Sequence, residues 1–364
     1  MTAGITVSNL TKGFGSTTVV DGLDLEVAQG EILVLLGPSG CGKTTTLRCL
    51  AGLETPSAGS IRFDDNAVFD SGTRLNVPIN KRNIGMVFQS YALWPHMTVR
   101  QNIAYPLKVR GMKKALAEGW VERAAAMVHC ENLLDRYPAQ LSGGQQQRIA
   151  LARGLVAQPS VVLLDEPLSN LDAKLRDQVR TEIRELHQEL GFTAVLVTHD
   201  QEEALALGDR VAIMKDGRIE QLDTPEGLFL KPATEYVAGF VGMSNRLEWN
   251  RTGSEWVTDG GVRVEASALS AVPGERAVSL IRPDDLTLHP ERPESASGRL
   301  VLDATLVTAE YGGRHVDVTL NAGGVRLHSR TGTGAGEAWV RTLEPGASVA
   351  VSVPHSSLHT YIAQ

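Results

Sequence analysis

The segment Gly37-Pro38-Ser39-Gly40-Cys41-Gly42-Lys43-Thr44-Thr45 decides the fold, because it fits the phosphate-binding pattern Gly-x-x-x-x-Gly-Lys-Thr at every fixed position. An apolar, strand-like run, Glu31 to Leu36, leads into it, and a helical pattern, Thr44 to Leu50, leads out. Glycines let successive backbone N–H groups converge on phosphate oxygens, and a helix N-terminus adds partial positive charge there. We therefore predict that this loop binds a nucleoside triphosphate.

Two side chains of this loop are expected to act on the nucleotide directly. Lys43 would reach the β- and γ-phosphates, and the hydroxyl of Thr44 would ligate the accompanying Mg²⁺. A glycine-rich turn with an unrelated lysine is the alternative, and the strand and helix on either side disfavour it. The loop alone leaves kinases, GTPases, helicases and transport ATPases open.

Length and composition restrict the class of protein. The chain has 364 residues, enough for about two domains. Its 42% hydrophobic and 21% charged residues disfavour a disordered chain, and its apolar runs are shorter than the roughly 20 residues that span a bilayer. Three cysteines and an N-terminus without a secretory pattern favour the cytoplasm. The net charge of −7 argues against a nucleic-acid partner.

Patterning predicts two domains. Residues 1–235 alternate strand-like and helical runs, which predicts an α/β domain on a largely parallel sheet. Period-two runs at Ile5–Val7, Thr18–Val20 and Leu23–Val27 predict an antiparallel patch beside that sheet, and residues of about 95–156, with a helical pattern over Ala115–Val128, predict an inserted helical subdomain. Residues 236–364 are expected to form a small all-β domain. Within it we expect strands at Leu300–Ala304, His315–Leu320, Val325–His328 and Ser348–Val353, and a loop at Pro290–Gly298.

Two further motifs follow the loop in order. Leu141-Ser-Gly-Gly-Gln-Gln-Gln-Arg148 precedes a helical run, and Val161-Val-Leu-Leu-Asp-Glu-Pro167 places two carboxylates after four apolar residues. With these motifs the chain resembles the ATP-binding subunits of ABC (ATP-binding cassette) transporters, whose signature is Leu-Ser-Gly-Gly-Gln and whose Walker B strand ends in Asp-Glu. The resemblance implies a P-loop NTPase fold of the ABC type, ATP and Mg²⁺ as cofactors, and ATP hydrolysis as the activity.

The two carboxylates stand at a strand end, where ligands of α/β folds collect. Asp165 would hold Mg²⁺, directly or through water, and Glu166 is the candidate general base that polarises the attacking water. A lone Asp-Glu pair is ordinarily a solvated strand end. The apolar run before it and Pro167 after it favour the functional interpretation.

Further site residues are implied by the resemblance. Gln89 resembles the Q-loop glutamine, which contacts Mg²⁺ and water and senses the permease. His199, followed by the acidic segment Asp200 to Ala204, resembles the switch histidine that contacts the γ-phosphate. Ser169 to Asp172 matches the D-loop, in which Asp172 shapes the dimer contact. Phe14 resembles the aromatic residue that stacks on adenine, and a buried core residue is the alternative.

The signature also implies an assembly. In the family, residues at the positions of Ser142, Gly143, Gly144 and Gln145 cap the γ-phosphate bound to the P-loop of a second copy. Two chains placed head to tail about a two-fold axis would form two composite sites and an isologous homodimer. Closure with ATP and opening after hydrolysis would be the power stroke.

Importer, soluble ABC ATPase and exporter subunit are the three functions considered. A single P-loop and the absence of a sustained heptad pattern disfavour the soluble translation and DNA-repair types. Ser279 to Asp285 and the β-rich remainder resemble the OB-like TOBE domain of importers for sugars, polyamines, ferric iron, sulfate or phosphonates. The segments Lys81 to Val99 and Asp223 to Leu228 also resemble those of such importers. The sequence of Lys81 to Val99 slightly favours the iron, polyamine and phosphonate group.

The resemblance implies partners outside this chain: a permease of one or two kinds of chain and, indirectly, a solute-binding protein. The chain would lie at the cytoplasmic face of the membrane, held by the permease. Tyr91, Leu93 and Trp94 are expected either to line the groove for the permease's coupling helix or to be core residues. Cys41, where many relatives have serine or alanine, needs no side-chain contact, and its alkylation should block ATP binding unless nucleotide is already bound.

Overall fold

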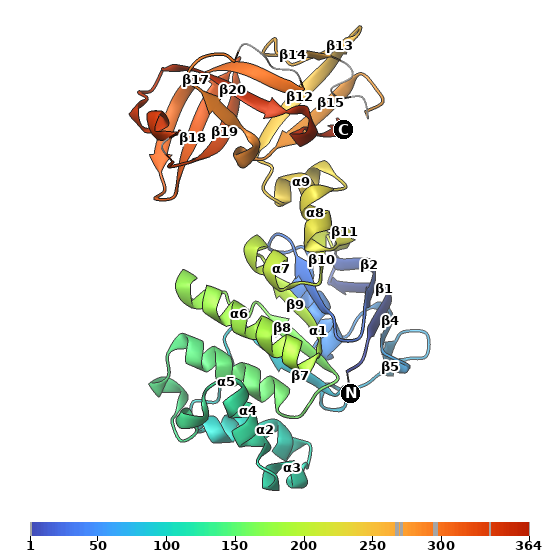
Figure 1. Cartoon of the computed structure of the whole chain (residues 1–364). Coiled ribbons are helices and arrows are strands. Elements are labelled where there is room, and N and C mark those ends of the chain that lie inside the picture. Colours follow the sequence, from blue (N-terminus) through green and yellow to red (C-terminus); the bar gives the residue numbers. More distant parts are fainter. Residues whose placement is uncertain (1, 266–268, 270–271, 294–297, 335, 364) are drawn as a thin grey trace. The chain divides into compact units, whose positions relative to one another are not determined.

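The structure is a computed structural model, and it describes residues 2–265, 269, 272–293, 298–334 and 336–363 (Figure 1). The chain divides into two compact units, Met1–Leu230 and Lys231–Gln364, a few residues before the boundary expected from patterning. No helix in these described ranges combines the length and the apolar character needed to cross a membrane.

A six-stranded sheet forms the centre of the first unit, in the order β11-β10-β3-β9-β8-β7. All neighbours pair in parallel except β11, which is antiparallel to β10. Strands β3, β8 and β9 are buried along their whole length, as expected for parallel strands covered on both faces. Their carboxyl ends therefore meet at one edge. The strands are β3 (Ile32–Leu36), β7 (Ile84–Val87), β8 (Val161–Asp165), β9 (Thr193–Thr198), β10 (Arg210–Lys215) and β11 (Arg218–Asp223).

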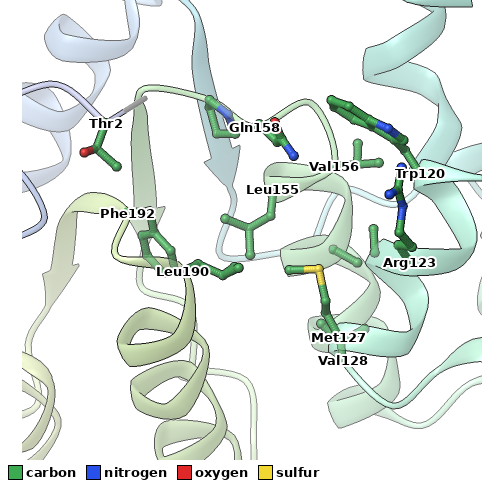
Figure 2. A pocket seen from close by; sticks show the side chains of 13 residues that line it. Thr2, Trp120, Arg123, Met127, Val128, Leu155, Val156, Gln158, Leu190 and Phe192 are labelled. Atoms are coloured by element: carbon green, nitrogen blue, oxygen red, sulfur yellow. The ribbon is translucent and has the colours of Figure 1, made fainter. Parts of the chain in front are cut away.

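Helices pack on this sheet and form a separate helical region of the same unit (Figure 1). The helical pattern of Ala115–Val128 is interrupted, because Glu118 ends one helix and Gly119, at φ 74°, caps the next. A cavity of about 310 Å³ lies between α4 and α5 on one side and the turn before β9 on the other (Figure 2). The helices are α1 (Lys43–Ala51), α2 (Val99–Val109), α3 (Lys113–Ala117), α4 (Trp120–Met127), α5 (Gly143–Leu155), α6 (Ala173–Leu190), α7 (Gln201–Leu207) and α8 (Pro225–Leu230), with 3₁₀ turns at Ile79–Lys81, Glu131–Leu133 and Pro138–Gln140.

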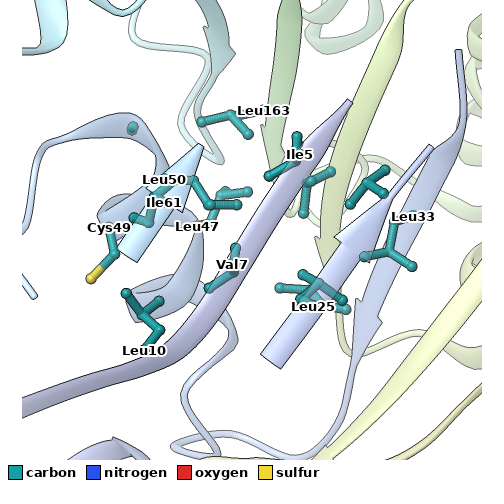
Figure 3. Close-up of a cluster of buried hydrophobic side chains, with 14 of the residues drawn as sticks. Ile5, Val7, Leu10, Leu25, Leu33, Leu47, Cys49, Leu50, Ile61 and Leu163 are labelled. Atoms are coloured by element: carbon teal, nitrogen blue, oxygen red, sulfur yellow. The ribbon is translucent and has the colours of Figure 1, made fainter. Parts of the chain in front are cut away.

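The expected antiparallel patch is confirmed as a five-stranded sheet in the order β2-β1-β4-β5-β6. The two runs expected after residue 17 form one strand, β2. Figure 3 shows Val7 of β1, Leu25 of β2 and Leu47 of α1 in one buried cluster, which joins this sheet to the central one. The strands are β1 (Ile5–Phe14), β2 (Thr17–Val27), β4 (Ala58–Phe63), β5 (Asn66–Asp70) and β6 (Leu75–Asn76).

The second unit is all-β, as expected, apart from α9 (Glu235–Phe240) and short 3₁₀ turns at Pro283–Asp285, Ala338–Thr342 and His355–Ser357. Its two antiparallel sheets have the orders β14-β13-β12-β15-β21 and β16-β20-β17-β18-β19 and share a core that includes Trp249 and Trp256. The four expected strands lie in β17 to β20. Pro290–Pro293 has no regular structure, and residues 294–297 of the expected loop lie outside the described residues. The strands are β12 (Asn245–Thr252), β13 (Glu255–Val257), β14 (Arg263–Glu265), β15 (Arg276–Ile281), β16 (Thr287–His289), β17 (Arg299–Tyr311), β18 (His315–Ala322), β19 (Val325–Gly332), β20 (Ser348–Pro354) and β21 (His359–Ile362).

Candidate functional site

The phosphate-binding loop connects the end of β3 to the first residue of α1. Gly42 has φ 105°, and a Cβ there would lie 2.6 Å from the carbonyl oxygen of Val19, so the turn requires glycine. Lys43 is buried, and its Nζ donates to the carbonyl oxygens of Gly37 at 2.7 Å and Pro38 at 2.9 Å. No side chain caps α1, so its first N–H groups can serve an anion. The remaining loop residues named above, Ser39, Gly40, Cys41, Thr44 and Thr45, lie in the same strand-loop-helix segment.

The hydroxyl of Thr44 and the carboxylate of Asp165 meet across the sheet edge. Thr44 Oγ1 donates to Asp165 Oδ1 at 3.4 Å. Burial raises the pKa of Asp165, and the charge of Arg48 and this hydrogen bond partly oppose the rise. Hydroxyl and carboxylate oxygens are ligands that Mg²⁺ prefers, so the pair fits the metal. Among the described residues, no three His, Cys, Asp or Glu side chains gather as a metal cluster. Because Mg²⁺ prefers octahedral coordination, two side chains would leave positions for phosphate and water oxygens.

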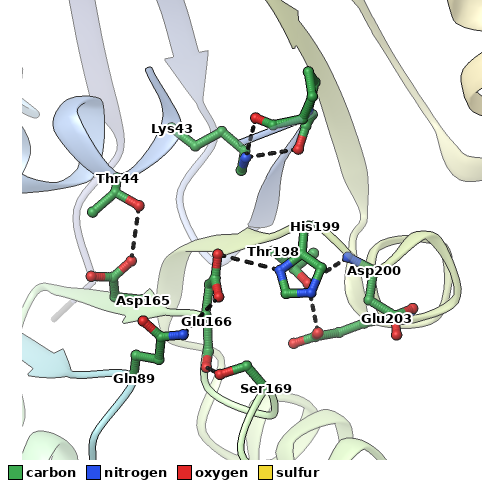
Figure 4. Close-up of polar contacts among 12 residues, drawn as sticks. Lys43, Thr44, Gln89, Asp165, Glu166, Ser169, Thr198, His199, Asp200 and Glu203 are labelled. Atoms are coloured by element: carbon green, nitrogen blue, oxygen red, sulfur yellow. Dashed lines mark hydrogen bonds and ion pairs between the residues drawn. The ribbon is translucent and has the colours of Figure 1, made fainter. Parts of the chain in front are cut away.

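Glu166 lies between residues from two neighbouring strands (Figure 4). Gln89, after β7, donates its Nε2 to Glu166 Oε2 at 3.0 Å, and His199 Nδ1, after β9, lies 3.3 Å from Oε1. Glu166 has φ 43°, unusual for a residue with a side chain, and its N–H donates to the carbonyl oxygen of Val197. Such backbone conformations cost about 1–3 kcal/mol and concentrate at functional sites. The structure thus brings Gln89, Glu166 and His199 together.

Side chains that sequence reasoning missed link the segment Ser169–Asp172 to Gln89 and to the turn that carries His199. Asn170 donates to the carbonyl oxygen of Gln89 at 2.8 Å. Arg176, in α6, pairs with Asp200 at 3.1 Å and donates to the carbonyl oxygen of Leu171. Because these partners are distant in sequence, no local pattern indicates them.

The signature residues begin α5. Ser142 is the N-cap: its hydroxyl accepts from the Gln145 N–H, and the Gln145 side chain accepts from the Ser142 N–H. Ser142 and Gly143 are exposed, whereas Gly144 is buried, and a Cβ on it would lie 2.8 Å from Leu175. Asp172, the N-cap of α6, is also exposed. These helix starts are accessible to a second chain.

Phe14 ends β1 and is 49% exposed, which excludes the core alternative. The Lys12 Nζ lies 4.6 Å from its ring centroid. Such an exposed ring can stack on a base.

The residues after Gln89 divide between the core and the lining of a pocket. Tyr91 is buried, and its hydroxyl has no hydrogen-bond partner among the described residues. Trp94 is half-buried and lines a pocket of about 270 Å³ with Phe88 and Arg153. The buried Arg153 donates to the carbonyl oxygens of Tyr91 and Ala92, both at 2.7 Å, and so holds two consecutive residues with positive φ. Leu93 is half-buried.

Comparisons with known proteins place two families along the chain. The family described as "ABC transporter" matches residues 20–169, and the family described as "TOBE domain" matches residues 279–360. The chain is 46% identical over 317 residues to the Fe(3+) ions import ATP-binding protein FbpC of Brucella abortus (strain 2308), covering 86% of each chain. It is 51% identical over 240 residues to the sulfoquinovosyl glycerol transport ATP-binding protein SmoE of Agrobacterium fabrum, covering 66% of this chain and 65% of that protein.

A solved structure is similar to the cassette. It is titled as the dimeric structure of a post-hydrolysis state of the ATP-binding cassette MJ0796 bound to ADP and Pi. The match has a TM-score of 0.52 and 30% sequence identity, and it covers 61% of this chain and 98% of that one.

Proposed function

This chain belongs to the ABC transporter family, as the ATP-hydrolysing subunit of an importer with a C-terminal TOBE domain, and from this premise we propose how its residues carry out the reaction. The iron-import relatives favour the importer over the soluble and exporter alternatives. The observation that carries the mechanism is the placement of Glu166 between Gln89 and His199.

We propose that Glu166 accepts a proton from the water that attacks the γ-phosphorus of ATP. The bond between the γ-phosphorus and the bridging oxygen breaks, giving ADP and phosphate. Lys43 and the loop N–H groups would bind the phosphates, and Phe14 would stack on adenine. Mg²⁺ held by Thr44 and Asp165, with Gln89 nearby, would supply neutralising charge. His199 would contact the γ-phosphate.

The proposed site is completed by a second copy. Ser142 to Gln145 would approach the γ-phosphate bound to the partner's P-loop, and Asp172 would lie at the contact. The exposure of Ser142, Gly143 and Asp172 supports this arrangement, as does the dimeric relative with ADP and Pi. Loss of the γ-phosphate would release the two chains.

Mixing two inactive variants tests the composite site. Lys43→Ala removes the phosphate contact of the P-loop. Ser142→Arg blocks the approach of the signature residues to the γ-phosphate of the other chain, so each homodimer should be inactive. In the mixed dimer, one site combines an intact P-loop with an intact signature from the other chain. Single-turnover ATP hydrolysis should therefore reappear on mixing. A mixture as inactive as its components would reject the trans arrangement.

The permease is the proposed membrane partner, with the pocket beside Trp94 as its docking groove and the cytoplasmic membrane face as the location. Ferric iron is the first solute to test, because the match to the iron-import relative extends well into the C-terminal unit. In cells that lack this chain, uptake of radiolabelled iron should be restored only when the wild-type chain is supplied. Uptake of sulfoquinovosyl glycerol instead would redirect the assignment.

A further inference from the structure

A buried glutamate adjoins the switch histidine and has no part in the scheme above. Glu203, in the first turn of α7, is 3% exposed. Its Oε2 accepts a hydrogen bond from the Thr198 hydroxyl at 2.7 Å, and that hydroxyl in turn accepts from the Asp200 N–H at 3.0 Å (Figure 4). The residues on both sides of His199 are thus tied to one carboxylate.

The arrangement extends an ordinary helix cap. In a capping box, the side chain at the third helical position accepts directly from the N-cap N–H. Here Asp200 is the N-cap, and its side chain accepts from the Glu203 N–H at 3.1 Å. The return contact, from Glu203 to the Asp200 N–H, passes through the Thr198 hydroxyl. Because Thr198 precedes His199, the cap includes the whole turn that carries the histidine.

Burial of the Glu203 carboxyl group costs free energy that a helix cap alone does not require. Its Oε1 is buried and accepts no hydrogen bond from the described residues. Burial raises the pKa of Glu203 to about 7. The charged groups that face it are Asp200, Arg176 and His199. A buried, half-satisfied carboxyl group beside a reaction centre calls for a role beyond packing.

We propose that Glu203 is a positioning residue for ATP hydrolysis, which through the Thr198 hydroxyl holds the backbone of His199 so that its imidazole faces Glu166. The inference rests on the proposed role of His199. Among the described residues, the hydrogen bonds of the Glu203 carboxylate and the Thr198 hydroxyl do not involve Gly37, Pro38 or Lys43. Breaking this hydrogen-bond relay of Glu203, Thr198 and Asp200 should therefore lower kcat and leave KM for ATP nearly unchanged.

Paired variants of the full chain test the relay. Thr198→Val keeps the β-branched shape and removes the hydroxyl, and Glu203→Leu removes the acceptor. Both should lower kcat at least tenfold with KM within about twofold. Thr198→Ser and Glu203→Gln keep a donor and an acceptor and should retain most of the activity. Glu202→Leu, at an exposed position in the same turn, is the matched control and should match wild type.

The double variant with His199→Ala separates the two proposals. If the relay acts through the histidine, Thr198→Val should cost no further activity in the His199→Ala background. Full activity of His199→Ala would reject the proposed role of the histidine. An inactive His199→Ala with a fully active Thr198→Val, or equal losses in both backgrounds, would overturn the positioning role alone. Thermal unfolding of each variant identifies misfolding. If Thr198→Val misfolds, the activities of Glu203→Leu and Glu203→Gln are compared instead.

Discussion

Gln89 and Glu166 face each other from the ends of adjacent parallel strands, and the Gln89 amide donates to the Glu166 carboxylate at 3.0 Å. His199, after the strand on the other side of β8, lies 3.3 Å from the second carboxylate oxygen. The proposed base is therefore held in place by residues from two other strands. This relationship leads to the first prediction.

Glu166→Gln should bind ATP and form the dimer but lose hydrolysis. The amide keeps the shape and the contact to Gln89 yet cannot accept the proton of the attacking water, and general-base catalysis typically contributes about 10²–10⁴-fold. Size-exclusion chromatography with ATP and a phosphate-release assay measure the two properties. Glu185→Gln, an exposed change on α6, is the control. Near wild-type turnover of Glu166→Gln would remove Glu166 as the base.

Cys41 should be the cysteine whose alkylation stops ATP binding. It is 4% exposed, but it follows the exposed residues Pro38 to Gly40, whereas burial raises the pKa of Cys49 and Cys130 to about 11. Peptide mass mapping after N-ethylmaleimide treatment should find Cys41 modified slowly, and only without ATP. Cys41→Ser should protect activity. Modified Cys41 with full ATPase activity would show that its side chain is sterically irrelevant.

Arg153→Met should destabilise the fold by roughly 2 kcal/mol, because hydrogen bonds to charged groups contribute about 1.5–3 kcal/mol. The substitution leaves the carbonyl oxygens of Tyr91 and Ala92 without their donor. Urea unfolding measures the loss. Arg153→Lys, which keeps one donor, should lose less, and the exposed Arg136→Met should lose little. Equal midpoints for Arg153→Met and Arg136→Met would show that the hydrogen bonds of Arg153 to Tyr91 and Ala92 do not stabilise the fold.

Glu203 should make stability fall as pH rises. Its folded pKa of about 7 exceeds the ordinary value of 4.5, so the folded state holds a proton that the unfolded state releases between these values. This contribution is fully present below pH 4.5 and is lost as pH rises through 7. Relative to Glu203→Gln, wild type should lose on the order of 3 kcal/mol from pH 4.5 to 8.

Urea unfolding of both proteins across that range measures the difference, and groups common to both cancel. Glu202→Gln, at an exposed position in the same turn, is the matched control. A constant difference between Glu203→Gln and wild type would show that Glu203 does not titrate in this range.

Local patterns were sufficient for the elements that carry the motifs. The apolar run before Gly37 predicted β3, the run before Asp165 predicted β8, and period-two alternation predicted the antiparallel sheet and the β-rich second unit. Buried parallel strands and amphipathic sheets leave such signatures within a few residues of each other. The pattern of Ala115–Val128 predicted one helix where the structure has two shorter ones. Periodicity does not indicate the N-cap at Gly119, where the second helix begins.

By itself, the sequence determined that the chain has a P-loop, a signature and a Walker B strand, and hence its family. Only the tertiary structure decided that Gln89, Glu166 and His199 meet, that Tyr91 is core while Trp94 lines a pocket, and that the Glu203 carboxylate accepts a hydrogen bond from Thr198, beside His199. The physical reason is the strand order: pairing β7, β8 and β9 side by side brings together residues far apart along the chain, and periodicity reports only near neighbours.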